Sequence, residues 1–208
     1  MDHIPAFPSD IAFSPSVKAY QERRGSRAAY RQMEENQGWR TAINAEIASF
    51  IAAQTSIFLA TVNAGGQPYI QHRGGPAGFL QVLDPRTIGF ADFSGNRQYI
   101  TAGNLADTSK ACLFLIDYML RRRVKIWGEA RVVEGDAILT GRLMPGGYKA
   151  RAERVILFDV KTLDTNCPQH IPQRFEAADV ARVIGEKDAR IADLEEELAK
   201  SRRDRNEK

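Results

Sequence analysis

Short β-branched and aromatic segments, separated by glycine, proline, asparagine and aspartate, fill the middle of this chain from Ser56 to Val160. Segments of this kind are typical of β-strands, and the residues between them favour turns. Residues 63–68 predict a hairpin loop, and residues 84–86 predict a tight turn. Consecutive strands with tight connections form an antiparallel meander or barrel. The expected strands are residues 57–62, 69–73, 79–83, 87–92, 111–117, 123–133 and 155–160.

Helices are expected on the N-terminal side of these strands. Ser14 followed by Pro15 is a typical helix start, because serine caps the first turn and proline fits its first position. Gly25 is a typical stop, and residues 28–35 predict a second short helix. The first forty residues are therefore expected to form a helical arm.

A stronger apolar pattern follows this arm. Thr41 is expected to cap a helix in which four large apolar side chains recur at helical spacing and share one face. We expect this face to pack against the sheet. Short helices are also expected at residues 136–143 and in a segment that reaches Asn104. The four apolar residues are Ile43, Ile47, Phe50 and Ile51.

The segment from Glu176 onward has a helical pattern and is mostly polar, with ten acidic and eight basic residues. Its apolar side chains alternate at spacings of four and three residues, interrupted at Lys187, as in the seam of a coiled coil. Two interpretations stay open: a helix that supports a dimer, and a solvated tail, because about three heptads with one lysine in the seam are marginal. The apolar positions are Val180, Ile184, Ile191, Leu194 and Leu198.

The overall composition is that of an ordinary soluble globular protein, with 43% hydrophobic and 26% charged residues among 208. A net charge of +3 is too small to indicate nucleic-acid binding. No apolar run approaches the roughly 18 residues that a membrane span needs, and the N-terminus lacks the pattern of a secretory signal. We therefore expect a cytoplasmic protein with two reduced cysteines and no membrane or nucleic-acid partner. The three histidines show no metal-ligand spacing, so no metal site is expected.

The first candidate site is the glycine-rich turn after the second expected strand. Arg73 ends that strand and is followed at once by Gly74 and Gly75. The arginine supplies a cation, and the glycines allow another group to approach the backbone N–H groups closely. This combination suits an anionic ligand such as a phosphate. The alternative is a turn that merely bends a barrel strand.

The second candidate is the loop of residues 92–98. It begins at Asp92, and Asn96 and Arg97 supply amide and guanidinium donors close to the start of an expected helix, where anions are favoured. This loop is either the other half of one site or a capped turn with a solvated arginine.

The third candidate lies on one face of the strand at residues 123–133. Strand alternation sends Val124 and Ile126 into the core and places Arg123, Lys125 and Trp127 together on the opposite face. Two cations and an indole suit a ligand that is both anionic and aromatic. A solvated outer face accounts for the charges but not for the tryptophan.

The fourth candidate is the loop of residues 166–172. It holds Cys167, Gln169 and His170 between prolines that stiffen it. A thiolate–imidazole pair is one interpretation. No companion acid is identifiable, however, so Cys167 is not expected to be a catalytic nucleophile.

Several motifs recur together along this chain: FLATV at 58–62, HRGGPAGF at 72–79, GN at 95–96, GNL at 103–105, RVKIWG at 123–128 and NCPQHI at 166–171. This set resembles the pyridoxamine 5'-phosphate oxidase-like proteins, which are FMN-binding split β-barrels, and it is most similar to the bacterial branch with an NCPQHI loop. The resemblance implies a mainly β protein with α-helices, namely a six-stranded antiparallel split β-barrel with flanking helices and a C-terminal helix. The resemblance covers the expected FMN-binding domain at residues 41–175, and the expected helical arm at residues 1–40 and charged helix at residues 176–208 lie outside it.

The resemblance also implies a homodimer with FMN bound at the subunit interface. Arg73 would lie against the flavin or its phosphate tail, and Gly74 and Gly75 would leave room for the ring. Ala91 and Asp92 would border the isoalloxazine.

Further implied contacts come from two other parts of the chain. Asn96 and Arg97 would bind the phosphate, whereas Arg123 and Lys125 match the strand that reaches across from the partner subunit in this family. The positive charge of these residues agrees with the interpretation of the strand given above.

Gln169 and His170 in the NCPQHI loop would donate hydrogen bonds to the ring. The vitamin B6 oxidases carry an arginine and tryptophan signature in their C-terminal segment, which grips the substrate phosphate. Here residues 172–175 lead instead into the charged helix. The resemblance therefore implies FMN binding more than pyridoxal phosphate synthesis.

These features favour an FMN-dependent oxidoreductase with a small-molecule substrate or a nicotinamide reductant. The flavin would carry the redox chemistry, so no catalytic side chain is assigned. The alternative is a non-enzymatic flavin-binding or stress-associated protein. A nucleic-acid binder, suggested by residues 121–123, is disfavoured by the small net charge.

Overall fold

The computed structural model describes residues 6–166 and 168–206. The chain divides into two compact units, Met1–Asp117 with Arg122–Gln169 and Tyr118–Arg121 with His170–Lys208. The first unit contains the sheet and the shorter helices. The second contains the C-terminal helix α6 (Ala177–Asn206).

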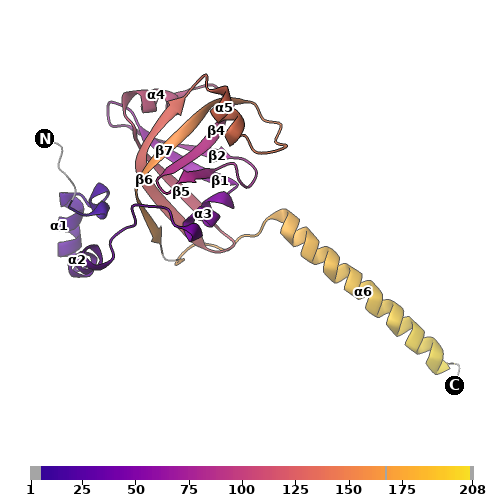
Figure 1. The fold of residues 1–208 in the computed structure, drawn as a ribbon. Coiled ribbons are helices and arrows are strands. Elements are labelled where there is room, and N and C mark those ends of the chain that lie inside the picture. Colours follow the sequence, from indigo (N-terminus) through magenta and orange to yellow (C-terminus); the bar gives the residue numbers. More distant parts are fainter. Residues whose placement is uncertain (1–5, 167, 207–208) are drawn as a thin grey trace. The chain divides into compact units, whose positions relative to one another are not determined.

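One sheet of seven strands forms the first unit, with every neighbouring pair antiparallel and the order β2-β1-β5-β6-β7-β4-β3 (Figure 1). The seven strands correspond to the seven segments read from the residues, whereas the family resemblance implied six. Among the described residues the outer strands β2 and β3 do not pair with each other, so the barrel stays split. The strands are β1 (Ser56–Val62), β2 (Pro68–Gly74), β3 (Gln81–Asp84), β4 (Thr87–Phe93), β5 (Lys110–Asp117), β6 (Arg122–Val133) and β7 (Ala152–Asn166).

Alternating burial along the strands builds the core. In β1 every second side chain is buried, and Ile57 and Leu59 are fully enclosed. Val124 and Ile126 of β6 point into the same core, as the alternation predicted. The helix α3 (Ala45–Ala52) adds Ile47, Phe50 and Ile51 to this cluster.

The start of α3 differs from the expectation that Thr41 caps it. The N-cap is Asn44, whose side chain accepts a hydrogen bond from the Ile47 N–H at 3.0 Å. Ile43 is buried but precedes the helix, and its N–H donates to the Pro85 carbonyl at 2.7 Å. Residues 41–43 are therefore held by the turn between β3 and β4, and the helix begins three residues later than expected.

Strand β7 is much longer than the expected residues 155–160. It pairs with β4 through its first half and with β6 along nearly its whole length. Thr162 and Leu163 are buried in its second half. Polar residues such as Lys161 suggested a strand end, but pairing with β6 extends the strand through them.

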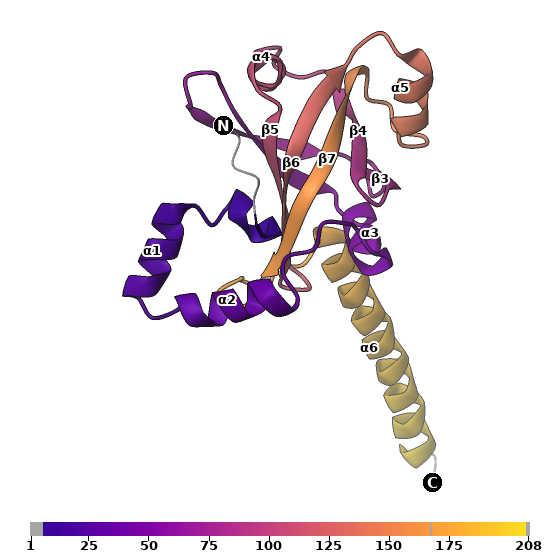
Figure 2. The same ribbon diagram turned by 60° about the vertical axis from the view of Figure 1, so that its left-hand side comes forward.

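The N-terminal arm packs beside the sheet, with the short helix η1 (Pro8–Ile11) near β7 (Figure 2). The helices α1 (Pro15–Arg23) and α2 (Arg27–Asn36) confirm the two helices expected there, and Ser14 caps α1. Trp39 stacks on Trp127 of β6, with ring centroids 4.8 Å apart and planes 15° apart. This stack explains the position of Trp127 through packing against Trp39, a contact that the alternation of the strand did not predict. The two remaining helices are α4 (Ile100–Asp107) and α5 (Ala137–Leu143).

Gly128 lies at a β-bulge where β6 crosses β7 closely. A Cβ added there would clash with the carbonyl oxygen of Asp159 and with the ring of Phe158. We expect Gly128→Ala to lower the free energy of unfolding by about 3 kcal/mol, because backbone must move to admit the methyl group. Gly141→Ala, in α5 with open space around it, is the matched control and should raise stability by roughly 0.5–1 kcal/mol. Urea unfolding measures both, and wild-type stability of Gly128→Ala would contradict the close approach.

Candidate functional site

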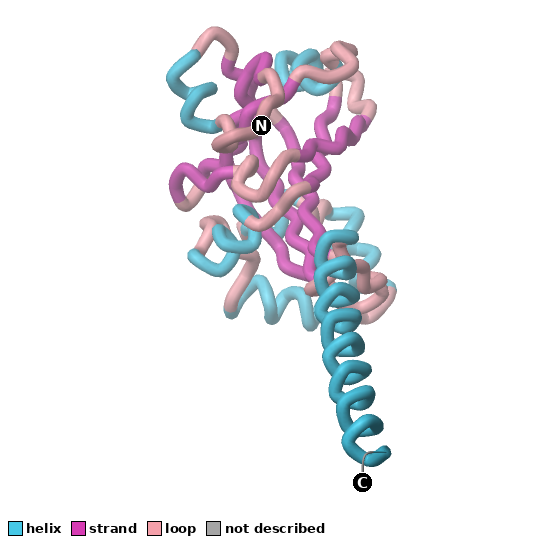
Figure 3. Tube along the Cα trace, turned by 90° about the vertical axis from the view of Figure 1, so that its right-hand side faces the viewer, coloured by secondary structure: helices cyan, strands magenta, loops and turns pink. Residues whose placement is uncertain are grey.

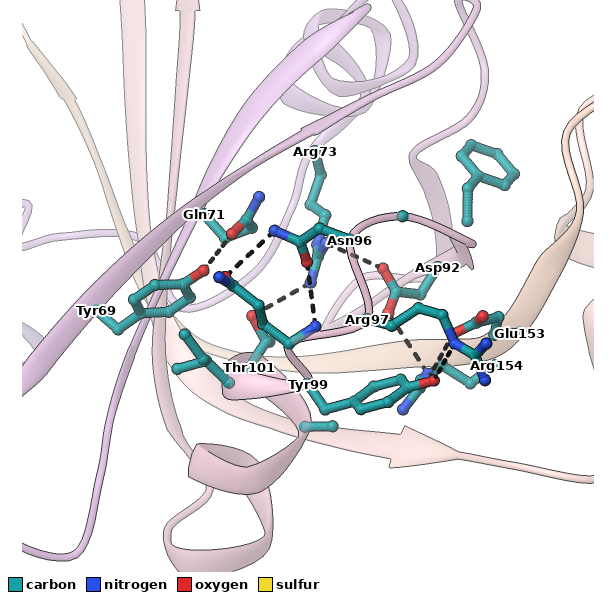
Figure 4. Close-up of a pocket in the computed structure, with 15 residues that line it drawn as sticks. Tyr69, Gln71, Arg73, Asp92, Asn96, Arg97, Tyr99, Thr101, Glu153 and Arg154 are labelled. Carbon is teal, nitrogen blue, oxygen red and sulfur yellow. Dashed lines mark hydrogen bonds and ion pairs between the residues drawn. The ribbon is translucent and has the colours of Figure 1, made fainter.

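A pocket of about 170 Å³ lies where β2, β4 and the start of β7 meet the loop of residues 94–99 and the first turn of α4. Figure 4 shows the side chains that converge on it from these five parts of the chain. The pocket contains three arginines, Arg73, Arg97 and Arg154, and two acids, Asp92 and Glu153. Its ionised side chains therefore carry an excess of positive charge.

Asp92 lies between two of these arginines. Its Oδ1 is 3.3 Å from Nη1 of Arg73, and its Oδ2 is 3.6 Å from Nε of Arg154. Strand pairing creates this arrangement, because Asp92 of β4 is directly opposite Arg154 of β7. Arg73 reaches the same place from β2 and also donates to Oγ1 of Thr101 at 3.2 Å. Four elements therefore hold two guanidinium groups at one wall of the pocket.

Hydrogen bonding at this wall is incomplete within the described residues. The Nε atoms of Arg73 and Arg154 and Oδ1 of Asp92 are buried without a hydrogen-bond partner. Buried polar groups in proteins are normally paired, so unpaired ones need an explanation, of which a bound ion is one. The two guanidinium N–H groups suit an anionic oxygen, and the carboxylate oxygen suits a hydroxyl donor.

The loop of residues 94–99 has a strained backbone. Arg97 and Tyr99 both adopt the left-handed conformation, with φ of 57° and 55°. Such conformations in non-glycine residues are costly and occur often at ligand sites. Arg97 donates from Nε to the Tyr99 hydroxyl at 3.0 Å, and the guanidinium of Arg154 lies 4.9 Å from the centre of the Tyr99 ring.

Tyr99 is also the N-cap residue of α4, and its side chain caps none of the N–H groups of the first turn. Ile100, Thr101 and Ala102 of that turn line the pocket. The first backbone N–H groups of a helix have no partner within the helix and attract anions. The pocket thus combines a helix start with arginine side chains.

Burial and charge shift the ionisation of the two acids in opposite directions. Burial raises the pKa of Asp92, although the charges of Arg73 and Arg154 oppose this shift. Hydrogen bonds from Arg154 and Ser94 lower the pKa of Glu153. Asp92 is therefore the acid of this pocket that gains a proton more readily than usual.

Asp92 should make the stability of the protein depend on pH. Between the ordinary pKa of 3.8 and the raised value in the folded state, the folded protein binds more protons than the unfolded chain. We therefore expect the free energy of unfolding, relative to Asp92→Asn, to increase as the pH falls through this window and to be level above it. Urea unfolding of both proteins at a series of pH values measures this difference. A relative stability that decreases on acidification would show that the arginines outweigh burial.

Four residues predicted from the sequence meet in this pocket: Arg73, Asp92, Asn96 and Arg97. The structure thus brings Arg73, at the end of β2, to the same pocket as the loop after β4, which agrees with the interpretation of that loop as the other half of one site. Asn96 and Gln98 bond to each other across this loop, with Nδ2 of Asn96 donating to Oε1 of Gln98 at 3.2 Å.

Three other predicted residues flank these positions but do not line the pocket. Ala91 is buried in a smaller apolar cluster with Leu143. Gly74 and Gly75 follow Arg73 outside the lining residues. A Cβ at Gly75 would lie 2.7 Å from the Cβ of Phe79, so tight packing of the turn also explains this glycine.

Arg123 and Lys125 lie on the outer face of β6, as the alternation predicted, and outside the pocket. Lys125 forms an ion pair with Asp164, its neighbour on β7, at 3.3 Å. The Nε of Arg123 is buried without a hydrogen-bond partner within the described residues.

Gln169 and His170 are exposed, and the pocket lining contains neither of them. Cys167 lies outside the described residues. The other cysteine, Cys112 of β5, is partly buried, and burial raises its pKa to about 11, so its thiol stays protonated at neutral pH.

Sequence reasoning missed Arg154, Thr101 and Tyr99. Arg154 precedes the segment that was read as a strand, within the charged residues 149–154, which resemble a solvated loop. Only its pairing with Asp92 across the sheet buries it. The helix start expected near the loop of residues 92–98 could have indicated Tyr99 and Thr101. No residue spacing in the sequence, however, singled out these two side chains.

Within residues 6–166 and 168–206, no cluster of three or more histidine, cysteine, aspartate or glutamate side chains has a geometry that would hold a metal ion. None of the helices in this part of the chain is both long and apolar enough to cross a membrane.

Comparison with solved structures gives similar chains at low identity. HupZ from Group A Streptococcus is 19% identical, with a TM-score of 0.49, over 64% of this chain and 99% of that chain. An FMN-binding protein from Syntrophomonas wolfei is 12% identical, with a TM-score of 0.45, over 73% of this chain and 97% of that chain. General stress protein 26 from Bacillus anthracis is 14% identical, with a TM-score of 0.45, over 58% of this chain and 90% of that chain.

A search of curated proteins gives no match. The family model described as pyridoxamine 5'-phosphate oxidase, however, matches residues 43–167, a span that begins just before α3 and reaches the end of β7. This span covers more than half of the chain and includes every strand of the sheet and the whole pocket. The protein therefore belongs to the pyridoxamine 5'-phosphate oxidase family.

Proposed function

We propose that the pocket binds the phosphate and sugar-alcohol part of FMN and that the protein is an FMN-dependent oxidoreductase of small molecules. The observation that carries this proposal is the pair of buried guanidinium Nε atoms, on Arg73 and Arg154, that make no hydrogen bond and lie beside a helix start. Both features favour a doubly charged phosphate. Membership of the pyridoxamine 5'-phosphate oxidase family supports the choice of FMN.

The donors divide between two parts of the proposed ligand. Arg73, Arg154, Asn96, Arg97 and the N–H groups at the start of α4 would hold the phosphate. Oδ1 of Asp92, which accepts no hydrogen bond in the structure, would accept one from a hydroxyl of the sugar alcohol. The charges of Arg73 and Arg154 beside Asp92 would offset the repulsion between its carboxylate and the phosphate.

The pocket is too small for the whole cofactor. Its volume of about 170 Å³ is below the roughly 300–1,000 Å³ of ordinary small-molecule sites. We therefore assign the ring to a space completed by a second copy of the chain, to which Arg123 and Lys125 of β6 and the loop with Gln169 and His170 would contribute. The unpartnered Nε of Arg123 supports this assignment, because it leaves a donor available.

When bound, the flavin supplies hydride or electron transfer. The residues of this chain bind it, orient it and set the charge around it. Positive charge from Arg123 or Lys125 at the ring would favour electron uptake. Two cysteines and no disulfide framework agree with a cytoplasmic site of action.

An absorption spectrum of freshly purified protein tests flavin binding. We expect a yellow protein with flavin absorption, or a colourless protein that binds added FMN. Anaerobic mixing with NADH and NADPH then tests redox activity. Bleaching at a useful rate supports the oxidoreductase, whereas a bound flavin that stays oxidised supports a flavin-binding or stress-associated protein. Protein that neither retains nor takes up FMN contradicts both.

A further inference from the structure

The C-terminal helix α6 carries an exposed apolar stripe along most of its length. It is a single unbroken helix of 30 residues (Figure 3). The stripe side chains are between 43% and 55% exposed, which is high for large aliphatic residues. An amphipathic helix usually buries such a stripe against another element. The stripe consists of Val180, Ile184, Ile191, Leu194 and Leu198.

The residue types at each position of this stripe favour one kind of partner. In the heptad register of the stripe, Ile184, Ile191 and Leu198 occupy the a positions, and Val180, Lys187, Leu194 and Ser201 occupy the d positions. Isoleucine at a with leucine at d, as at Ile191 and Leu194, favours parallel two-stranded coiled coils. Lys187 and Ser201 place polar side chains at two d positions, which lowers the stability of the pair.

The charges beside the stripe agree with a parallel, in-register pair. In such a pair each g position faces the e position five residues later on the other helix. Arg190 would face Glu195 of a second copy, and Glu197 would face Arg202 of a second copy, so both contacts join opposite charges.

Among the described side chains of α6, the ion pairs involve none of these four residues. Arg182 pairs with Glu186 at 2.8 Å, and Lys200 pairs with Glu196 at 2.7 Å. All four of these residues occupy c and f positions, on the face opposite the stripe. Intrahelical pairs therefore stabilise the outer face, while the flanks of the stripe keep their charges for another chain.

The surface around the start of the stripe is apolar as well. Phe175 and Met119, both in the second unit, are exposed and line a shallow cavity together with Val180, Val183 and Ile184. The acid-rich character of the segment from Glu176 onward, with ten acids and eight bases, disfavours an anionic lipid surface or a nucleic acid as the occupant.

We propose that α6 pairs with α6 of a second copy as a parallel, in-register, two-stranded coiled coil. This contact is distinct from the pocket and does not depend on flavin binding. It assigns the apolar stripe to a second copy of this chain and resolves the two interpretations of the helix in favour of dimer support.

Disulfide cross-linking of the full chain tests the pairing. In a background with Cys112→Ser and Cys167→Ser, Leu198→Cys places a thiol at an a position, where the two copies meet in a parallel pair. Ala189→Cys, at an f position of the same helix, is the matched control. Under mild oxidation at low protein concentration we expect Leu198→Cys to form dimers at least ten times faster than Ala189→Cys.

Equal slow rates for both cysteine variants would overturn the proposal and leave the stripe to a different partner. An antiparallel pair would also overturn it. That arrangement would appear as dimers formed only when Val180→Cys protein, with its thiol near the helix start, is mixed with Leu198→Cys protein.

A charge exchange tests the register. Arg190→Glu alone and Glu195→Arg alone each place like charges opposite one another twice in the dimer, so each should slow the cross-linking of Leu198→Cys several-fold. The double variant restores opposite charges and should restore the rate. A double variant as slow as the single variants would contradict the register. Binding of added FMN, measured on the same proteins, should be unchanged, so failure of the flavin proposal and failure of this one are distinguishable.

Discussion

Replacing both Arg73 and Arg97 with alanine should abolish retention of FMN during purification. Each charge-assisted hydrogen bond to a phosphate contributes roughly 1.5–3 kcal/mol. Loss of two guanidinium groups should therefore weaken binding by at least about 100-fold. Fluorescence titration of FMN into the variant measures the affinity, and the visible spectrum of the purified protein measures retention.

The control for this variant must carry the same change in net charge. Arg131→Ala with Arg142→Ala removes two arginines that do not line the pocket, so this protein should bind FMN as the wild type does. Arg154 still neutralises Asp92 in the Arg73 and Arg97 variant, which should therefore fold. A folded double variant that still purifies yellow would show that the phosphate lies elsewhere.

Arg154→Ala should lower the free energy of unfolding by about 3 kcal/mol, because it removes one of the two arginines beside the buried Asp92 and leaves only Arg73 to compensate the carboxylate. Arg154 is among the few buried charged residues of the chain. It contacts Glu153 at 2.8 Å, Glu134 at 3.1 Å and Asp92 at 3.6 Å. Because Asp92 is mostly buried, water compensates for little of the electrostatic stabilisation that its carboxylate loses with Arg154. Urea unfolding measures the change.

Two companion variants separate this cause from a general effect of removing an arginine. Arg131→Ala breaks an ion pair with Asp159 in which both side chains are about half exposed, and such pairs are worth roughly 0–1 kcal/mol. Adding Asp92→Asn to Arg154→Ala removes the buried charge of Asp92, and this second change should recover part of the stability that Arg154→Ala loses. A loss for Arg154→Ala no larger than that for Arg131→Ala would mean that Asp92 finds another partner.

The strands were predictable because alternation and turn residues are local signals. Alternation in β6 identified Val124 and Ile126 as core residues, and both are fully buried. The ends of elements were less predictable. Asn44 rather than Thr41 caps α3, and Ile43 before it donates to the distant Pro85 carbonyl, a contact that no local pattern contains.

The candidate site divides in the same way. Arg73 and Arg97 stood out because each lies close to glycine near the end of a strand. Gly74 follows Arg73, and Gly95 precedes Arg97 by two residues, so backbone N–H groups and a cation can both reach a ligand there. Arg154 did not stand out, because a charged residue beside other charged residues resembles a solvated one. Trp127 suggested a ligand face, yet Trp39 stacks on it.

The sequence by itself determined the seven strands, the flanking helices, the amphipathic stripe of α6 and two arginines of the pocket, because these follow from periodicity and from residues adjacent in the chain. Only the tertiary structure decided that β2, β4, β7 and α4 converge and that Asp92 lies between Arg73 and Arg154. It also decided that the Nε atoms of these two arginines are buried without a hydrogen-bond partner. Burial and unpaired donors depend on which distant strands become neighbours, and that pairing is a property of the whole sheet.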